Sequence, residues 1–400
     1  MVKENTPFAI GFWQYYEFGR YGAAESAKEW QDMYANIAYS YRLKKGENPE
    51  KMTELLNECE KKSMKLIIVD DRLGWNELAS RGEEEYKKGV KACVERFAAH
   101  PACFAFMTGD EPTGRQFPQA KRAVQIIQSY TDKPAFVNFY PSWFGEEFDS
   151  SMQIKGEEYE KALDDFIKES GLKLLAYDCY SQMSVRNEES GVNNYFRNLN
   201  LFRRLAQKNG IPCWTSLLCV EHWQFRLPSK TDLRWQLSTA IASGMKGAQW
   251  FELYEMNHED YWEGYPKNKY GELSEQWRLL RDVNRELTEK PLFPLLPYLR
   301  FIDTHHLGAV YGDSYYYFDG CDKNVAHFSA LCGGDAILTH FEDVRDGADV
   351  YMAVNNSVRQ KDYFSLEFKG ENSVFNKKMW LVPGGFFSVK LKKEKGAEKR

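Results

Sequence analysis

The chain has 400 residues, of which 43% are hydrophobic and 28% are charged, a size of two or three domains and an ordinary composition for a globular protein. Its 53 basic and 58 acidic residues give a formal charge of -5, so the basic surplus of most nucleic-acid-binding proteins is missing. No window approaches the ~18 uninterrupted apolar residues of a spanning helix. We therefore expect neither nucleic acid nor a membrane as a partner, while the oligomeric state stays open.

From residue 8 to about residue 290, short apolar runs typical of strands alternate with amphipathic stretches typical of helices. The expected strands cover residues 8–15, 36–42, 65–72, 103–111, 135–141, 173–181, 212–221 and 247–255. The expected helices cover residues 23–36, 49–63, 83–99, 117–131, 157–170, 193–209, 230–243 and 272–289. The pattern is thus eight consecutive strand–helix units.

This alternation predicts a closed (β/α)8 barrel over residues 1–290. Strands joined through helices pair in parallel, and strands that are apolar on both faces need cover on both sides. Eight such units over this length match the barrel's usual size of about 250 residues. A doubly wound open sheet is the alternative, but the first strand–helix turn lacks a GxGxxG phosphate loop.

After residue 290 the pattern changes. Residues 291–297 contain three prolines and indicate a linker. Residues 298–393 then show runs of period two separated by turn signals, without a long helical pattern, which predicts an all-β sandwich domain. Residues 394–400 form a charged tail that we expect to be a solvated end.

In a barrel of this kind the active site lies at the carboxyl ends of the strands. Acids and aromatic rings dominate there. Aromatic rings stack on the C–H faces of sugars, carboxylates and amides bind sugar hydroxyls, and two carboxyls can cleave a glycosidic bond. The candidates for substrate binding are Trp13, Tyr15, Asp70, Asp110, Asn138, Tyr140, Asp178, Tyr180, His222, Trp223 and Trp250, and those for catalysis are Glu111, Glu221 and Glu252.

The most specific motif is Thr-Gly-Asp-Glu-Pro at residues 108–112, which closes the fourth expected strand. At this point the sequence resembles the clan A glycoside hydrolases, whose fourth strand usually ends in Asn-Glu-Pro. The resemblance implies that Glu111 is the acid/base, that Asp110 replaces an Asn that commonly contacts the sugar 2-hydroxyl, and that Trp250 forms the floor of the sugar site. It also implies a nucleophile at the end of the seventh strand, which here is Glu221. Glu252 and Asp178 remain alternatives.

Other chemistries lack their motifs. The sequence contains no HExxH, P-loop, GxSxG or paired-cysteine motif, and His222 has no neighbours at metal-ligand spacing. We expect no metal and no cofactor. The predicted function is a retaining glycoside hydrolase that acts on an oligo- or polysaccharide. The alternative is a carbohydrate-binding barrel that has lost one catalytic group.

The cysteines and the N-terminus say little about the compartment. The eight cysteines form no CxxC pair, and several lie in apolar runs, so we expect buried free thiols rather than disulfides. The start of the chain lacks the apolar core of a signal peptide. A periplasmic or secreted location is expected if a leader has been removed, and a cytoplasmic one otherwise.

Overall fold

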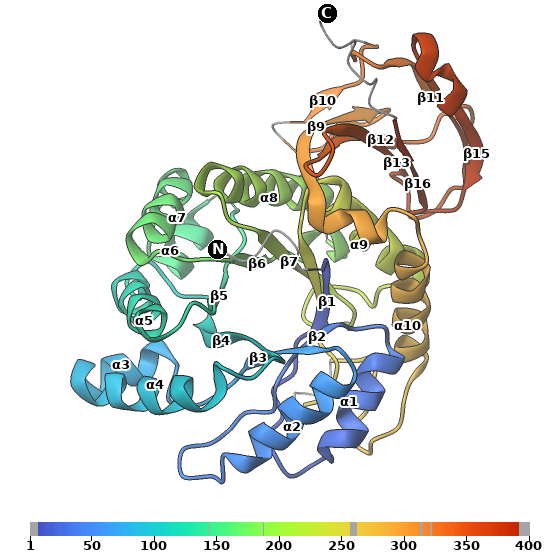
Figure 1. Cartoon of the computed structure of the whole chain (residues 1–400). Helices are drawn as coiled ribbons and strands as arrows, with labels where there is room; N and C mark the ends of the chain where they lie inside the picture. Colours follow the sequence, from blue (N-terminus) through green and yellow to red (C-terminus); the bar gives the residue numbers. More distant parts are fainter. Residues whose placement is uncertain are drawn as a thin grey trace, which may run out of the picture.

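The computed structural model describes residues 7–143, 145–186, 188–256, 262–312, 315–320 and 322–391. Its first part is a ring of eight strands surrounded by helices (Figure 1). Every strand pair in this sheet is parallel, in the order β1-β8-β7-β6-β5-β4-β3-β2. The strands are β1 (Ala9–Phe12), β2 (Ile37–Tyr39), β3 (Lys65–Ile68), β4 (Cys103–Asp110), β5 (Ala135–Phe139), β6 (Leu175–Asp178), β7 (Cys213–Leu218) and β8 (Gly247–Phe251).

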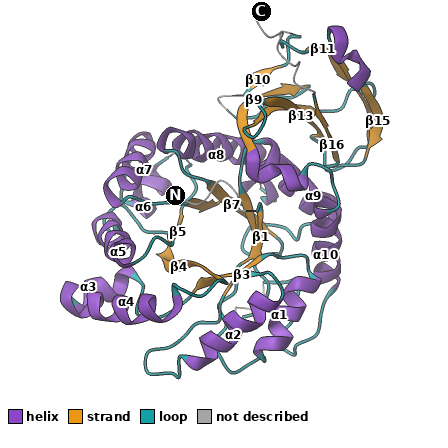
Figure 2. Ribbon diagram, viewed as in Figure 1, coloured by secondary structure: helices purple, strands orange, loops and turns teal. Residues whose placement is uncertain are grey.

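The helices form the outer layer of this ring (Figure 2). Those that follow the expected pattern are α1 (Ala23–Asp32), α2 (Glu50–Lys61), α4 (Glu83–Phe97), α5 (Phe117–Tyr130), α7 (Gly156–Ser170), α8 (Glu188–Asn209), α9 (Lys230–Ala242) and α10 (Glu275–Thr288). Two short helices, α3 (Trp75–Arg81) and α6 (Glu146–Met152), were not expected because seven residues are too few to show a helical period. None of the described helices is long and apolar enough to cross a membrane.

The ring closes between β1 and β2, where Asn36, just before β2, forms hydrogen bonds with the backbone of β1 and of the residue that precedes it. The Asn36 backbone N–H donates to the Ile10 carbonyl at 3.0 Å. The Asn36 side chain accepts from the Ile10 N–H at 2.9 Å and donates to the Phe8 carbonyl at 2.8 Å. This closure excludes the doubly wound open sheet and confirms the predicted barrel.

The inside of the barrel is filled by large side chains rather than open. Trp13 stacks on Tyr39 with ring centroids 4.4 Å apart, and Phe104 stacks on Trp214 at 5.2 Å. Residues from all the strands except β8 contribute to this interior cluster, and Phe251 of β8 packs against it. A functional site must therefore lie at an end of the barrel, which is the usual arrangement of the fold.

The chain continues as a second, all-β part after a 3-10 helix, η2 (Phe293–Tyr298), at the expected linker. One sheet has the order β10-β9-β12-β13-β16, and the other has the order β11-β14-β15. The strands are β9 (Leu299–Leu307), β10 (Tyr316–Tyr317), β11 (Val325–Ala330), β12 (Ala336–Asp343), β13 (Ala348–Asn355), β14 (Asp362–Phe368), β15 (Lys377–Leu381) and β16 (Phe386–Lys390). This confirms a C-terminal β domain. The charged tail lies outside the described residues.

The five-stranded sheet has two apolar faces. One face packs against the three-stranded sheet through Leu338, Phe364 and Leu366. The other packs against the barrel's helical layer, where the Trp235 indole N–H donates to Asn356 Oδ1 at 2.8 Å. The β domain is thus fixed to the barrel on the side of α9.

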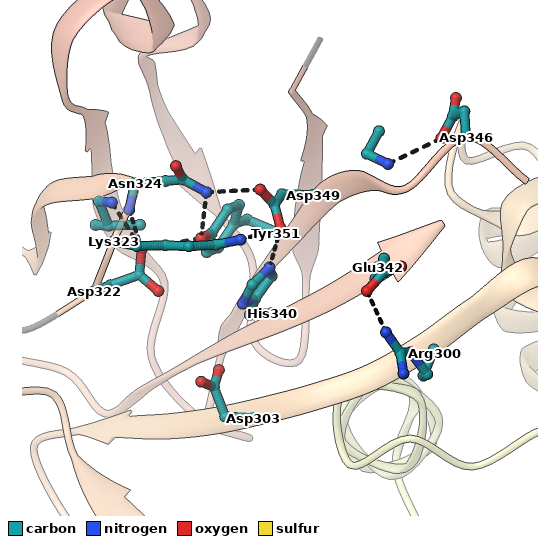
Figure 3. Close-up of polar contacts among 12 residues, drawn as sticks. Arg300, Asp303, Asp322, Lys323, Asn324, His340, Glu342, Asp346, Asp349 and Tyr351 are labelled. Atoms are coloured by element: carbon teal, nitrogen blue, oxygen red, sulfur yellow. Dashed lines mark hydrogen bonds and ion pairs between the residues drawn. The ribbon is translucent and has the colours of Figure 1, made fainter. Parts of the chain in front are cut away.

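The β domain also holds a polar network (Figure 3). The Asp349 carboxylate accepts from Lys323 Nζ at 2.8 Å and from Asn324 Nδ2 at 2.9 Å, and it pairs with His340 Nε2 at 2.7 Å. The His340 ring stacks on Tyr351 at 4.6 Å. Burial alone would raise the pKa of Asp349, but the hydrogen bonds from Lys323, His340 and Asn324 lower it. With its charge compensated, this cluster ties a loop to β12 and β13.

The described cysteines form no disulfide. Six of them are buried free thiols, as expected, whereas Cys332 is exposed and Cys321 lies outside the described residues.

A buried ion pair anchors the loop that follows β8. Lys267 is 3% exposed, and its Nζ lies 2.6 Å from Glu29 Oε2 on α1. The Tyr254 hydroxyl donates to Glu29 Oε1 at 3.3 Å, and the Lys267 ammonium lies 3.8 Å from the Tyr21 ring centroid. The pair therefore links the loop after the last barrel strand to the first helix.

Lys267→Met should destabilise the protein by about 3–5 kcal/mol, because it leaves the Glu29 carboxylate buried without its cation. The control is Lys28→Met, which removes an exposed pair with Asp32 (70% and 55% exposed side chains) and should leave the midpoint of urea unfolding nearly unchanged. Urea unfolding of both variants measures the difference. Equal destabilisation by the two substitutions would show that the buried pair has no special weight.

Candidate active site

The end of β4 turns sharply and presents two consecutive acids. Gly109 has φ 149°, and a Cβ there would lie 2.2 Å from the Trp75 ring. Glu111 has φ 49°, a left-handed conformation that costs a non-glycine residue roughly 1–2 kcal/mol. Its backbone N–H donates to the Asn138 carbonyl at 2.9 Å. At position 109 only glycine allows the backbone to approach the Trp75 indole so closely. The left-handed backbone conformation of Glu111 is a strain of the kind that is typical of functional sites.

Three carboxyl groups from β4 and β6 meet around one amide from β5. Asn138 Nδ2 donates to Asp110 Oδ1 at 3.0 Å and to Asp178 Oδ1 at 2.8 Å. The Glu111 carboxyl donates a hydrogen bond to Asp178 and accepts one from the Tyr140 hydroxyl. Asp110 is exposed, Glu111 and Tyr140 are half-buried, and Asp178 is 9% exposed. We call Asp110, Glu111 and Asp178 the acid cluster.

The acid cluster holds protons strongly. Burial, followed by the charges of Asp178 and Asp110, raises the pKa of Glu111 well above its ordinary range. Burial and the charge of Asp110 raise the pKa of Asp178. Burial also raises the pKa of Asp110, because its carboxylate is surrounded by the barrel even though solvent reaches it. The shift is largest for Glu111, so this residue is the member of the cluster that most favours its protonated form.

An aromatic wall continues from the acid cluster. Tyr15, just after β1, is 37% exposed, and enclosure followed by the charges of Asp110, Glu252, Asp178 and Glu111 raises its pKa. Its ring meets Phe251 at 6.4 Å, and Phe251 stacks on Tyr180 at 5.5 Å. Further rings of this wall are His222, Trp223, Phe225 and Trp262, of which Trp223 is 70% exposed.

The structure corrects the extent of the seventh strand. β7 ends at Leu218, and Glu221 lies three residues further on, in a loop. The Glu221 backbone pairs with that of Glu263 through hydrogen bonds of 2.9 and 3.2 Å. The expected strand reached residue 221 because Cys219 and Val220 extend the apolar run; both are buried, but in the loop. The fold does not place Glu221 at the tip of β7.

Glu252 comes directly after β8, across a cis peptide bond to Phe251. Its side chain is 0% exposed, and burial followed by the charge of Glu252 raises the pKa of Tyr265. The charge of Glu252 and those of the acid cluster all act on Tyr15. Glu252 and the acid cluster are therefore both close enough to Tyr15 to act on its pKa.

Two of the predicted binding residues, Trp250 and Asp70, face the helical layer, and a third, Trp13, is buried inside the barrel next to Tyr15. The Trp250 indole N–H donates to Asn284 Oδ1 on α10 at 3.0 Å, so this side chain points into the helical layer. The Asp70 carboxylate forms an ion pair with the Arg72 guanidinium at 2.5 Å and accepts a hydrogen bond from Cys93 Sγ at 3.7 Å. Trp13 lies inside the barrel, where its indole N–H donates to Ser216 Oγ at 2.8 Å.

The sequence pattern missed Phe251, Trp262 and Tyr265. Phe251 is the last residue of β8, and only its ring contacts distinguish it from a core residue. Trp262 and Tyr265 lie in the long loop after β8. A loop has no sequence periodicity from which the side chains that contact the site could be predicted. Within the described part of the chain, no group of three or more His, Cys, Asp or Glu side chains is arranged to hold a metal ion.

No protein-family model and no curated protein matches the sequence, but solved structures share its fold. A glycoside hydrolase family 5 protein from Bacteroides vulgatus ATCC 8482 is 12% identical with a TM-score of 0.54, over 97% of this chain and 89% of that one. The β-galactosidase of Bacillus circulans sp. alkalophilus is 13% identical with a TM-score of 0.56, over 75% and 58%. That of the psychrophilic Marinomonas ef1 is 11% identical with a TM-score of 0.53, over 70% and 59%.

The chain therefore shares the (β/α)8 barrel fold of these three proteins, which confirms the resemblance at the level of the fold. It spans less than three fifths of both β-galactosidases. At these identities the likeness concerns the fold alone, and the chemistry has to be argued from the side chains.

Proposed function

We propose that the protein is a glycoside hydrolase with Glu111 as its general acid. The observation that carries the proposal is the acid cluster: a glutamic acid at a barrel-strand end whose pKa is raised by burial and by neighbouring acids, in hydrogen-bond contact with Asp178 and beside the solvent-accessible Asp110. Glycosidic bond cleavage needs a carboxyl group that is still protonated at the working pH and can donate to the leaving oxygen. The glycoside hydrolases that share the fold support this assignment.

In the proposed reaction Glu111 protonates the leaving oxygen as the glycosidic bond breaks, and a second carboxylate attacks the anomeric carbon. Glu111, now ionised, then takes a proton from the water that releases the sugar. The product keeps the anomeric configuration of the substrate, which makes the mechanism retaining. Asp110 and Asp178 bind the sugar, and the rings of Tyr15, Tyr140 and Tyr180 line its binding position.

For the second carboxylate we propose Glu252. Retaining enzymes hold the two carboxyl groups about 5–5.5 Å apart, whereas Asp178 touches Glu111 directly and fits better as the group that keeps it protonated. Glu221 lies in a loop beyond β7. Glu252 directly follows β8, and its charge acts on Tyr15 as the charges of the acid cluster do. Because Glu252 is enclosed in the ligand-free protein, attack requires substrate binding to open the side chains around it.

The test is turnover of a panel of nitrophenyl glycosides and β-linked oligosaccharides by the purified wild-type protein. We expect release of nitrophenol from at least one glycoside, and NMR of the first product should show the anomer of the substrate. Binding of a sugar without any turnover would instead establish the carbohydrate-binding barrel. An inverted product would overturn the retaining mechanism but not the hydrolase assignment.

A further inference from the structure

Apart from the Glu111 proton, which the proposed reaction uses, the polar atoms at the acid cluster that can bind a ligand are acceptors. Asn138 Nδ2 donates hydrogen bonds to Asp110 and to Asp178. Its carbonyl oxygen Oδ1 is buried, at a residue 3% exposed, and has no hydrogen-bond partner among the described residues. The carboxylate oxygens of Asp110 and Asp178 are acceptors too whenever they are ionised. A ligand that satisfies this cluster must bring hydrogen-bond donors.

The negative charge that these carboxyl groups carry when they are ionised is not compensated by any cation among their strongest partners. The groups that act most strongly on Asp110, Glu111 and Asp178 are one another, Asn138 and Tyr140, and none of these is a cation. The contrast with Asp70 and Asp349 is clear, because Arg72 pairs with the first and Lys323 with the second. Carboxylates grouped away from bulk water attract a cationic ligand and repel an anionic one.

We propose that the sugar ring held at Asp110 and Asp178 is an amino sugar with a protonated amine. This inference rests on the proposed hydrolase function and names the substrate class of the same site. An ammonium group supplies three donors and one positive charge, so it meets both requirements of the cluster at once. An acetamido group supplies one N–H without charge, a hydroxyl supplies one O–H, and a uronic acid adds a further negative charge.

The experiment compares ligands that differ only at C2 of the ring. Nitrophenyl glycosides of the gluco and galacto series, each with an amino, an acetamido or a hydroxyl group at C2, are assayed at about pH 6, where an amine is protonated. The corresponding free sugars are titrated by calorimetry. In the series that the protein accepts, the amino compound should be favoured over the hydroxyl compound by about 10- to 100-fold in kcat/KM or Kd, as expected for a charge-assisted hydrogen bond. This preference should shrink as NaCl is added.

Asp110→Asn isolates the charge, because it keeps the size of the side chain and removes one carboxylate. The preference for the amino compound should fall by about 10-fold or more in this variant. The matched control, Asp165→Asn, removes an exposed carboxylate of α7 that pairs with Lys161, and it should leave the preference unchanged.

The outcomes separate the two proposals. Turnover of hydroxyl glycosides without a preference for the amine, or a preference that survives in Asp110→Asn, overturns the amino-sugar inference and leaves the hydrolase standing. A preference for the acetamido compound assigns the site to N-acylated sugars and overturns the requirement for charge. The absence of both turnover and binding in either series overturns both proposals.

Discussion

Glu111→Gln should lower kcat by about 10²–10⁴-fold, because it removes the proton that the leaving oxygen needs. Gln keeps the length and the polar contacts of the side chain, so sugar binding should survive. The loss should be smallest for nitrophenyl glycosides, whose leaving group needs little protonation, and largest for oligosaccharides. Steady-state kinetics on both substrate types measures this difference. A variant that retains wild-type turnover of oligosaccharides would exclude Glu111 as the acid.

The same substitution should stabilise the protein at alkaline pH. The folded-state pKa of Glu111 is raised, so the fold favours the protonated form. That stability is fully present below the unfolded-state pKa of about 4.3 and is lost as the pH rises through the folded-state pKa. Gln stays neutral and avoids the loss. Glu111→Gln should therefore melt at least ~2 °C above the wild type at pH 8, with the gap closing toward pH 4.

The control for the pH effect is Glu147→Gln on the exposed face of α6, which should show no pH-dependent gain. Scanning calorimetry at several pH values follows all three proteins. A Glu111→Gln variant less stable than the wild type at pH 8 would contradict the raised folded-state pKa of Glu111. Loss of activity together with a gain in stability is the combination expected of a functional rather than a structural residue.

The second large effect concerns the nucleophile. Glu252→Gln should lower kcat by at least ~10³-fold, whereas Glu221→Gln should change it by less than ~10-fold, because Glu221 lies in a loop beyond β7. The smaller variant Glu252→Ala should regain activity when azide is added, because the anion occupies the space of the lost carboxylate and attacks in its place. The product should be a glycosyl azide of inverted configuration.

This comparison discriminates between the two glutamates even if one substitution harms folding. Circular dichroism and sugar binding report on the fold of each variant. Azide rescue that gives a glycosyl azide of inverted configuration occurs only at the residue that attacks the sugar, because rescue at the acid/base gives the azide of retained configuration. Rescue of Glu221→Ala with no rescue of Glu252→Ala would return the nucleophile to the loop. If Asp178→Ala is inactive and azide restores its activity with inverted configuration, the nucleophile is Asp178 in the acid cluster.

Much of the architecture could be predicted because it depends on local patterns. Apolar runs that alternate with amphipathic stretches predict a parallel sheet, since helix crossovers require parallel pairing, and eight such units favour a closed barrel over an open sheet. The acids at the end of β4 could also be placed, because Gly109, Asp110 and Glu111 end an apolar run where the chain must turn. The predicted end of the seventh strand was wrong, because Cys219 and Val220 are buried in a loop as fully as they would be in a strand.

The composition of the site depended on tertiary structure to a greater degree. Trp250 and Phe251 are neighbours on β8, and alternation sends one ring to Asn284 in the helical layer and the other to Tyr15 at the site. The register that decides between them is set by pairing with β1 and β7. The sequence pattern favoured Trp250, and a one-residue difference in side-chain direction replaced it with Phe251.

By itself the sequence determined a (β/α)8 barrel with a C-terminal β domain and an Asp-Glu pair at the tip of the fourth strand. Only the tertiary structure brought Asp178 into contact with Glu111 and set Asn138 between the two aspartates. It also separated Asp70 and Glu221 from them. The reason is physical: strand patterns report which residues are buried, whereas the protonation of a carboxyl depends on which other charges lie within a few ångströms, and those come from strands far apart in the chain.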